Sequence, residues 1–98
     1  MTNQEINHAI ATEINDWIHD EGIFYHDGNG KICYLADYCN SIPHALDLAY
    51  AHGIGLKPAG DNWNAYQVVN EPISGTDALA SKAICLCLLE GLAPSIST

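Results

Sequence analysis

The sequence contains no arginine, and its only lysines are Lys31, Lys57 and Lys82. Twelve acidic residues outnumber these three bases and give a formal net charge of −9. Without guanidinium groups the chain lacks the side chain that binds phosphates in a bidentate way, and its negative field repels nucleic acids and anionic membrane surfaces. The composition therefore argues against direct binding to nucleic acid or to a membrane.

Long apolar runs are also absent. The longest, from Ala83 to Leu89, is far shorter than the ~20 residues that cross a bilayer. The first residues have neither the basic segment nor the apolar stretch of a secretory signal. We therefore expect a protein of the cytoplasm, where thiols stay reduced.

Recognisable catalytic and metal-binding motifs are missing as well. The sequence has no nucleophile elbow, zinc-protease helix, phosphate loop or dinucleotide fingerprint. Its four cysteines do not have the spacing of a structural zinc site, and the proximity of Cys39 to His44 is the one hint of a thiol enzyme. We expect no enzymatic activity, no cofactor and no metal. A metal site stays open as the alternative to thiols that pack as small core residues.

The length of 98 residues and the hydrophobic share of 48% are typical of one compact domain. We expect this domain to span residues 1–94 and a loose tail to follow at residues 95–98. The fold class that we predict is α/β (α+β), in which three helices pack on one small antiparallel sheet. The expected order is helix, strand, strand, helix, a possible short strand, strand and helix.

Local signals place these elements. Thr2 and Glu5 form a capping-box pattern at the start of a helix that we expect to end at Gly22. Turn-forming residues 27–30 indicate a hairpin between residues 23–26 and 31–35. A second helix should begin near Asn40 or Ser41 and end at Gly53. A strand is expected at residues 63–69 and a shorter one at 54–57, before a third helix at residues 77–90 that Thr76 caps.

The third predicted helix is apolar nearly all the way round. Such a helix is buried by its own domain or by a partner chain. Cys85 and Leu89 project on the same side as Lys82, so we expect them to be its most exposed apolar residues. A homodimer interface at this position is one hypothesis, and a central helix shielded by its own domain is the alternative.

Two regions of the sequence resemble the phage ABA-sandwich family. The first is Leu35-Ala36-Asp37-Tyr38, followed by Asn40-Ser41-Ile42 and Ala45-Leu46, and the second runs from Gly75 through the closing helix to Leu89. With the opening helix and the hairpin, the resemblance covers roughly residues 4 to 90. It implies a small protein encoded by a phage or prophage, with helices on both faces of a small antiparallel sheet. It implies no activity, and Ala36 and Asp77 stand where the family pattern has proline.

Acidic residues supply the first candidate site. Carboxylates in a row can imitate phosphates toward a groove lined with lysine and arginine, and their field speeds encounter with a basic partner. On the predicted first helix several acids share one stripe, and others follow just beyond it. A solvated face that keeps the protein soluble is the alternative. The candidate partner-binding residues are Glu13, Asp16, Asp20, Glu21 and Asp27.

Aromatic residues supply the second candidate site. Tyrosine and tryptophan beside predicted strands can stack on a base or anchor a partner protein, although core packing explains most such residues. Strand alternation puts Trp63 and Tyr66 on opposite faces. The candidate ligand or interface residues are Tyr38, Trp63, Tyr66, Cys85 and Leu89.

These features lead to competing functional hypotheses. The first is a non-enzymatic phage accessory protein in the cytoplasm of a bacterial host, which binds a host defence protein stoichiometrically and inhibits it. The second is a sponge that sequesters a nucleotide second messenger of antiviral signalling, against which the scarcity of positive charge counts. The third is a virion or accessory component without a role against defence.

Overall fold

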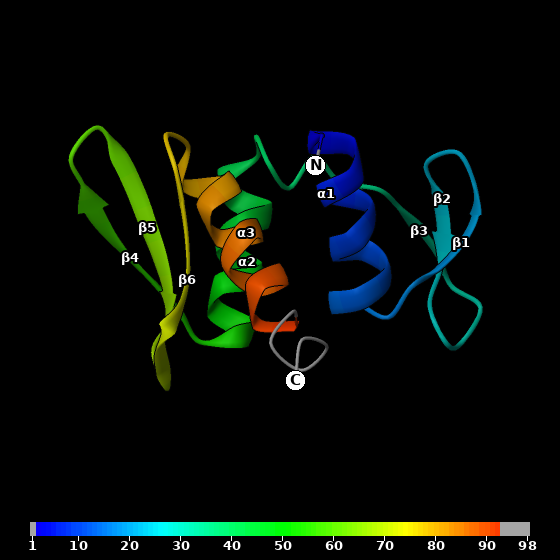
Figure 1. The fold of residues 1–98 in the computed structure, drawn as a ribbon. Helices are drawn as coiled ribbons and strands as arrows, with labels where there is room; N and C mark the ends of the chain where they lie inside the picture. The colour runs from blue at the N-terminus through cyan, green and yellow to red at the C-terminus, as the bar shows by residue number, and fades with distance from the viewer. Residues whose placement is uncertain (1, 93–98) are drawn as a thin grey trace.

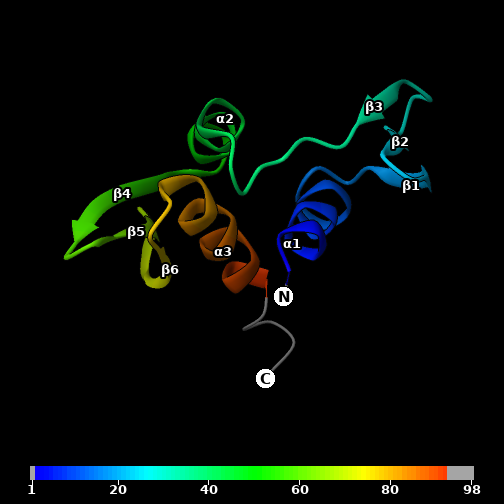
Figure 2. The same ribbon diagram turned by 90° about the horizontal axis from the view of Figure 1, so that it is seen from above.

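The computed structural model describes residues 2–92 and contains three α-helices and two three-stranded antiparallel sheets. Two helices, α2 (Ile42–His52) and α3 (Ala80–Leu92), lie beside a sheet made of β4 (Ile54–Ala59), β5 (Asn62–Gln67) and β6 (Asn70–Asp77). The helix α1 (Asn3–Ala9) lies between α3 and the other sheet, made of β1 (Ile18–Glu21), β2 (Phe24–His26) and β3 (Ile32–Tyr34) (Figures 1 and 2). The predicted mixed α/β class is confirmed, but two sheets take the place of the single sheet that we expected between the helices. The predicted tail at residues 95–98 lies outside the described part of the chain.

The first helix ends well before Gly22. α1 (Asn3–Ala9) begins with the predicted capping box, in which Glu5 N–H donates to Thr2 Oγ1 over 3.1 Å and Thr2 N–H donates to Glu5 Oε1 over 2.9 Å. It continues as a π-helical turn, η1 (Ile10–Ile14). Asp16 then takes a left-handed conformation with φ +57°, which stops the helix. The prediction of a helix up to Gly22 was wrong.

The segment after Asp16 forms a strand because it pairs with the hairpin. β1 (Ile18–Glu21) lies antiparallel to β2 (Phe24–His26), which in turn pairs with β3 (Ile32–Tyr34). Together these strands make the first sheet. The hairpin of β2 and β3 was predicted correctly, and its turn is held by Asp27 Oδ1, which accepts from the backbone N–H groups of Asn29 and Lys31 over 2.8 and 2.9 Å.

The second helix and the strand after it follow the sequence signals closely. α2 (Ile42–His52) has Pro43 in its first turn and ends at Gly53 in the left-handed region. β4 (Ile54–Ala59), β5 (Asn62–Gln67) and β6 (Asn70–Asp77) form the second sheet in that order. β4 extends beyond the short strand expected at residues 54–57, and β5 ends two residues before the predicted limit at Val69.

β6 was missed, and the third helix starts later than expected. Thr76 and Asp77, which we expected to open this helix, pair with Asn64 and Trp63 of β5. The Asp77 carboxylate then accepts from Leu79 N–H over 3.0 Å, and α3 (Ala80–Leu92) begins one residue later. Cross-strand pairing therefore takes residues that the local cap signal assigned to the helix.

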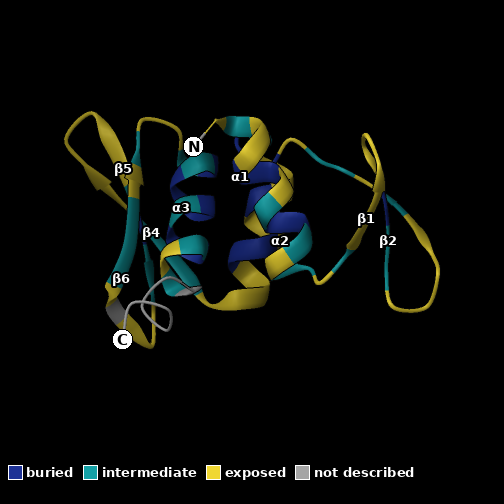
Figure 3. Cartoon of the chain, turned by 45° about the vertical axis from the view of Figure 1, so that its right-hand side comes forward, coloured by how far each residue is buried: buried dark blue, intermediate teal, exposed yellow. Residues whose placement is uncertain are grey.

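The core surrounds α3, which packs against the second sheet, α2 and α1. Buried residues concentrate on the helices, whereas the first sheet is largely exposed (Figure 3). Cys85 is fully buried, so the expectation that it projects outward was wrong. Its helix is shielded by its own domain on that side. The buried core consists of Ile6, Ile10, Tyr38, Cys39, Ala45, Leu48, Ala49, Ala65, Ala83, Ile84, Cys85, Cys87 and Leu88.

Candidate binding surface on the first sheet

The outer face of the first sheet is apolar and exposed. Phe24 pairs with Tyr34, and His26 pairs with both Ile32 and Ile18, so the side chains of these residues share one face of the sheet. The phenyl and phenol rings of Phe24 and Tyr34 lie 5.5 Å apart in an edge-to-face arrangement. The large apolar members, here called the apolar face, have exposed fractions of 54%, 46%, 62% and 62%; they are Ile18, Phe24, Ile32 and Tyr34.

The opposite face of the same sheet attaches it to the body of the protein. Tyr25 is 1% exposed, and its hydroxyl lies 2.7 Å from His8 Nδ1 on α1. The rings of His19 and Trp17 pack around Tyr25 at 4.7 and 6.3 Å. Burial raises the pKa of the Tyr25 phenol. The apolar face is thus the outside of a sheet whose inside is anchored.

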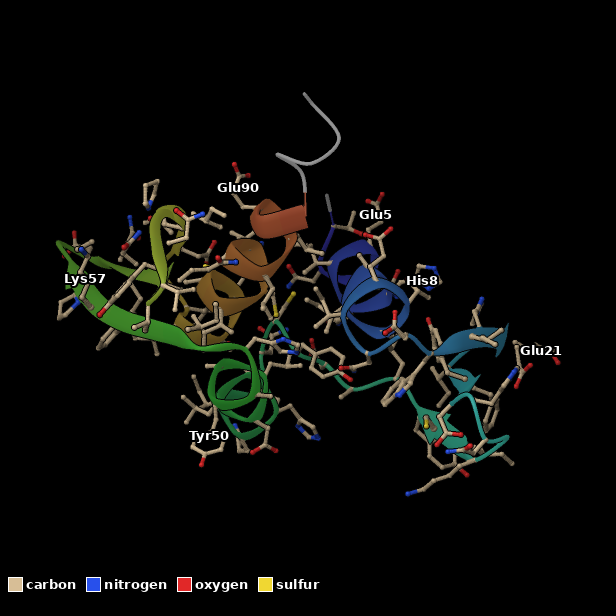
Figure 4. All side chains as sticks on the ribbon, turned by 90° about the horizontal axis from the view of Figure 1, so that it is seen from below. Glu5, His8, Glu21, Tyr50, Lys57 and Glu90 are labelled. Atoms are coloured by element: carbon tan, nitrogen blue, oxygen red, sulfur yellow. The ribbon has the colours of Figure 1, made fainter. Side chains whose placement is uncertain are left out.

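Two of the predicted acids border the apolar face. Glu21 pairs with Phe24 across the strands, and the Asp20 carboxylate lies 2.9 Å from His26 Nδ1. Both acids are exposed. Figure 4 places Glu21 at the far end of the first sheet, at the opposite end of the molecule from Lys57 on the second sheet. Negative charge therefore lies directly beside the exposed apolar side chains.

The other predicted acids do not continue a helical stripe. Glu13 lies on η1 and Asp16 on the link to β1, so the stripe that we expected on one straight helix is absent. Asp27 lies in the turn between β2 and β3, where hydrogen bonds from the backbone of Lys31 and Asn29 lower the pKa of its carboxyl. Lys31 is the one lysine in the part of the chain from β1 to β3.

The aromatic candidates of the second sheet do not form one site. Tyr66 lies on the outer face, where its ring sits against Gly55 and Lys57 Nζ lies 5.0 Å above it. Trp63 belongs to the opposite face, because it shares the side of β5 that carries the buried Ala65. The ligand role of Trp63 and Tyr66 stays a prediction.

The remaining candidates are largely buried. Tyr38 is 4% exposed and Cys85 is fully buried, while Leu89 is half-buried and packs against the core. With Cys85 inside, the surface that suggested a homodimer at α3 is reduced to Leu89. Among residues 2–92, no three His, Cys, Asp or Glu side chains are arranged to hold a metal ion, and no helix is long and apolar enough to cross a membrane.

The exposed apolar face itself was not predicted. Its signal is present in the sequence as the alternation of Phe24 and His26 with Tyr25, and of Ile32 and Tyr34 with Cys33. Alternation assigns successive side chains of a strand to opposite faces of the sheet, but it does not show which of the two faces the rest of the protein covers. That distinction depends on where α1 packs.

The comparisons with known proteins establish a similarity of fold. The chain is similar to a phage protein from Bacillus cereus of known crystal structure, with a TM-score of 0.67 and 14% sequence identity over 93% of this chain and 88% of the other. No protein-family model and no curated protein sequence matches the chain. The resemblance to the ABA-sandwich family therefore stays a prediction.

Proposed function

We propose that this chain is a non-enzymatic phage accessory protein that binds a partner protein stoichiometrically through the apolar face and its acidic border. The partner would be a component of a host antiviral defence in the bacterial cytoplasm, which the bound chain inhibits by covering its surface. The observation that carries the proposal is the exposed row of Ile18, Phe24, Ile32 and Tyr34 on an anchored sheet.

The apolar face has the physical features of a protein-binding surface. Exposed apolar groups that lie side by side favour burial against a partner, and aromatic side chains commonly supply the largest share of binding energy. The Phe24–Tyr34 pair is held in a defined arrangement by its cross-strand register. Less conformational entropy is lost when such side chains are already ordered before binding.

The acidic border indicates the charge of the partner. Asp20 and Glu21 would face lysine or arginine side chains at the edge of the contact, which raises the association rate and excludes acidic partners. The net charge of −9 adds a long-range attraction to any basic surface. A second copy of this chain, with the same acids, would meet repulsion at this border.

A phage origin is supported by two likenesses. The fold is similar to that of a phage protein from Bacillus cereus, and the sequence motifs resemble the phage ABA-sandwich family. Neither likeness names a partner or a process, so the surface argument supports the binding of a partner, and the test below decides the role against host defence.

The test uses bacteria that carry an antiviral defence and express this chain during phage challenge. We expect the wild-type chain to restore plaque formation and Asp20→Lys/Glu21→Lys to reduce that effect by at least about tenfold, because two attractive contacts become repulsive. Asp16→Lys is unsuitable for this purpose, since a lysine at φ +57° would be strained. Asp61→Lys, in the turn after β4, changes charge away from the first sheet and serves as the control.

Equal activity of the folded double variant and the wild type would remove the acidic border from the proposal. Failure of the wild-type chain against every defence tested, although it still binds a host protein through the first sheet, would retain the binding surface and reject the role against defence. Release of a nucleotide from heat-denatured protein, detected by mass spectrometry, would instead support the sponge hypothesis.

A further inference from the structure

Helix α2 carries an exposed row of apolar side chains that belongs neither to the buried core nor to the proposed binding surface. Ile42, Leu46 and Tyr50 follow one another at intervals of four residues, which places them along one side of the helix. Their exposed fractions are 43%, 46% and 94%, and Figure 4 shows Tyr50 pointing away from the body of the protein. These three residues are here called the α2 row.

A different side of α2 attaches the helix to the core. Ala45, Leu48 and Ala49 are at most 7% exposed and belong to the core around α3. Pro43 in the first turn and Gly53 at the end fix the limits of the helix. A surface helix normally keeps one apolar side, which faces its own core. The second apolar side of α2 therefore has no use in the packing of the described chain and is typical of a contact with another molecule.

The segment that carries the α2 row is electrically neutral in a strongly acidic chain. Residues 38–60 contain one acidic residue, Asp47, and one lysine, Lys57, so their formal charges cancel. The eleven other acids and the two other lysines carry the whole net charge of −9. A basic partner is therefore not attracted to this segment, whereas two copies of the chain meet the least repulsion there. Charge thus favours a second copy as the molecule that covers the α2 row.

The spacing of the α2 row fits a symmetric contact. Leu46 lies four residues from Ile42 and four from Tyr50, so a twofold axis at Leu46 brings each Ile42 opposite Tyr50 of the second copy and the two Leu46 side chains together. Rows of side chains spaced by four residues pack into one another when two helices cross at about 50°. One row therefore supplies both halves of the contact, and Tyr50 supplies the aromatic group that commonly contributes most to binding.

We propose that the α2 row is the interface of a weak, symmetric homodimer, in which α2 of each copy packs antiparallel on α2 of the other. A contact made by two short helices is smaller than the interface of a stable complex, and two chains of charge −9 repel each other at long range. Association is therefore reversible, and salt strengthens it by screening the repulsion. The α2 row shares no residue with the first sheet, so the dimer does not depend on the proposed function.

Sedimentation equilibrium of the full chain, from micromolar to millimolar concentration, tests this proposal. We expect the mean mass to rise from monomer toward dimer with concentration. The association should tighten as sodium chloride increases from about 0.01 to about 1 M, because the Debye length falls from about 30 to about 3 Å over this range. A contact between the acidic border and a basic partner would weaken over the same range, so salt separates the two interactions. A monomer at every concentration and salt would overturn the proposal.

Two charge variants locate the interface at the higher salt concentration. Leu46→Glu brings two like charges together at the twofold axis and should weaken dimerisation at least about tenfold. Ile23→Glu, at a 55% exposed position between β1 and β2, adds the same charge away from α2 and should change dimerisation less than about twofold.

A measurement on the wild-type chain locates the interface without any substitution. Backbone amide signals of the ¹⁵N-labelled protein, followed by NMR during dilution, should shift in α2 and stay constant in the first sheet. Undiminished dimerisation of the folded Leu46→Glu variant, equal weakening by both variants, or dilution shifts confined to the first sheet would overturn the proposal.

Discussion

The two sheets of this protein both have three antiparallel strands in chain order, but the strands of the second sheet are longer, and the two sheets relate differently to the core. The second sheet packs on α3, with Ala65 fully buried on β5 and Gly75 of β6 in close approach to the helix. The first sheet buries Tyr25 and leaves all four residues of β1 exposed. One sheet therefore builds the core, while the other is attached to α1 and presents its outer face to solvent.

This difference shows where function can lie in a small domain. A residue such as Ala65 is constrained by α3, so its identity serves the fold. Within the described chain, packing does not account for the apolar residues on the outer face of the first sheet, because apolar side chains that stay in water add little to the stability of the fold. Their exposure is what makes this sheet the candidate binding surface.

The two sheets should differ most in how well each tolerates the replacement of a glycine by alanine. A Cβ atom on Gly75 would lie 2.5 Å from Cys87 N and 2.8 Å from Ala83 O, both backbone atoms of α3, whereas a Cβ on Gly28 in the β2–β3 turn meets nothing within 4 Å. We expect Gly75→Ala to lower the free energy of unfolding by about 3 kcal/mol and Gly28→Ala to change it by less than about 0.5 kcal/mol. Urea denaturation measures both, and equal effects would contradict the packing described for β6.

Thiol reactivity should separate the same regions. Burial raises the pKa of Cys85 to about 12 and that of Cys87 to about 11, while Cys33 on β3 is half-buried. Since the thiolate is the reactive form and needs access, we expect iodoacetamide at pH 8 to modify Cys33 about a hundredfold faster than Cys85 in the folded protein. Peptide mass spectrometry over time gives the rates. Comparable rates without denaturant would mean that α3 is not shielded.

The attachment of the first sheet can be weakened at one atom. Tyr25→Phe removes the hydroxyl that lies 2.7 Å from His8 Nδ1 and should cost about 1 kcal/mol, the usual contribution of one hydrogen bond. Tyr34→Phe, on the exposed face, is the control and should cost nothing measurable. Amide exchange in β2 should accelerate in the first variant alone. If both variants behave alike, Tyr25 does not anchor the sheet through its hydroxyl.

The smallest expected effect is the pH dependence of stability that comes from Asp37, which lies between β3 and α2. Hydrogen bonds from Asn40 and Asn7 lower the pKa of the Asp37 carboxyl. A lowered folded pKa adds stability above the unfolded value of about 3.9, and this contribution is lost as pH falls through the folded value. Because Asp37 is exposed, we expect less than about 1 kcal/mol. Asp37→Asn should flatten the decline in thermal stability below about pH 4, and an unchanged decline would assign it to other carboxyls.

The sequence predicted the elements whose signals are local. α2 has a proline in its first turn and a glycine at its end, and the β2–β3 turn has Asp27 as an acceptor for two backbone amides. These interactions lie within a few residues, so the sequence alone reveals them.

Elements that depend on distant pairing were not predicted. Ile18–Glu21 continues a helical pattern of apolar residues in the sequence, but pairing with β2 makes it a strand. Thr76 and Asp77 look like a helix cap, but they pair with β5. The candidate site was found in part for the same reason: the acids Asp20 and Glu21 were named, while their position beside Phe24 and His26 arises from the sheet register.

Quantitative capture of host proteins tests the central claim most directly. Tagged wild-type chain, Ile32→Ser/Tyr34→Ser and the control Tyr50→Ser/Val69→Ser, whose two wild-type side chains are each 94% exposed outside the first sheet, are expressed in prophage-bearing bacteria, and the bound proteins are measured by mass spectrometry. We expect one partner to be retained by the wild type and the control and lost at least tenfold with the first-sheet variant, all three chains being folded by circular dichroism. Equal retention by all three would contradict the claim that the outer face of the first sheet is the binding surface.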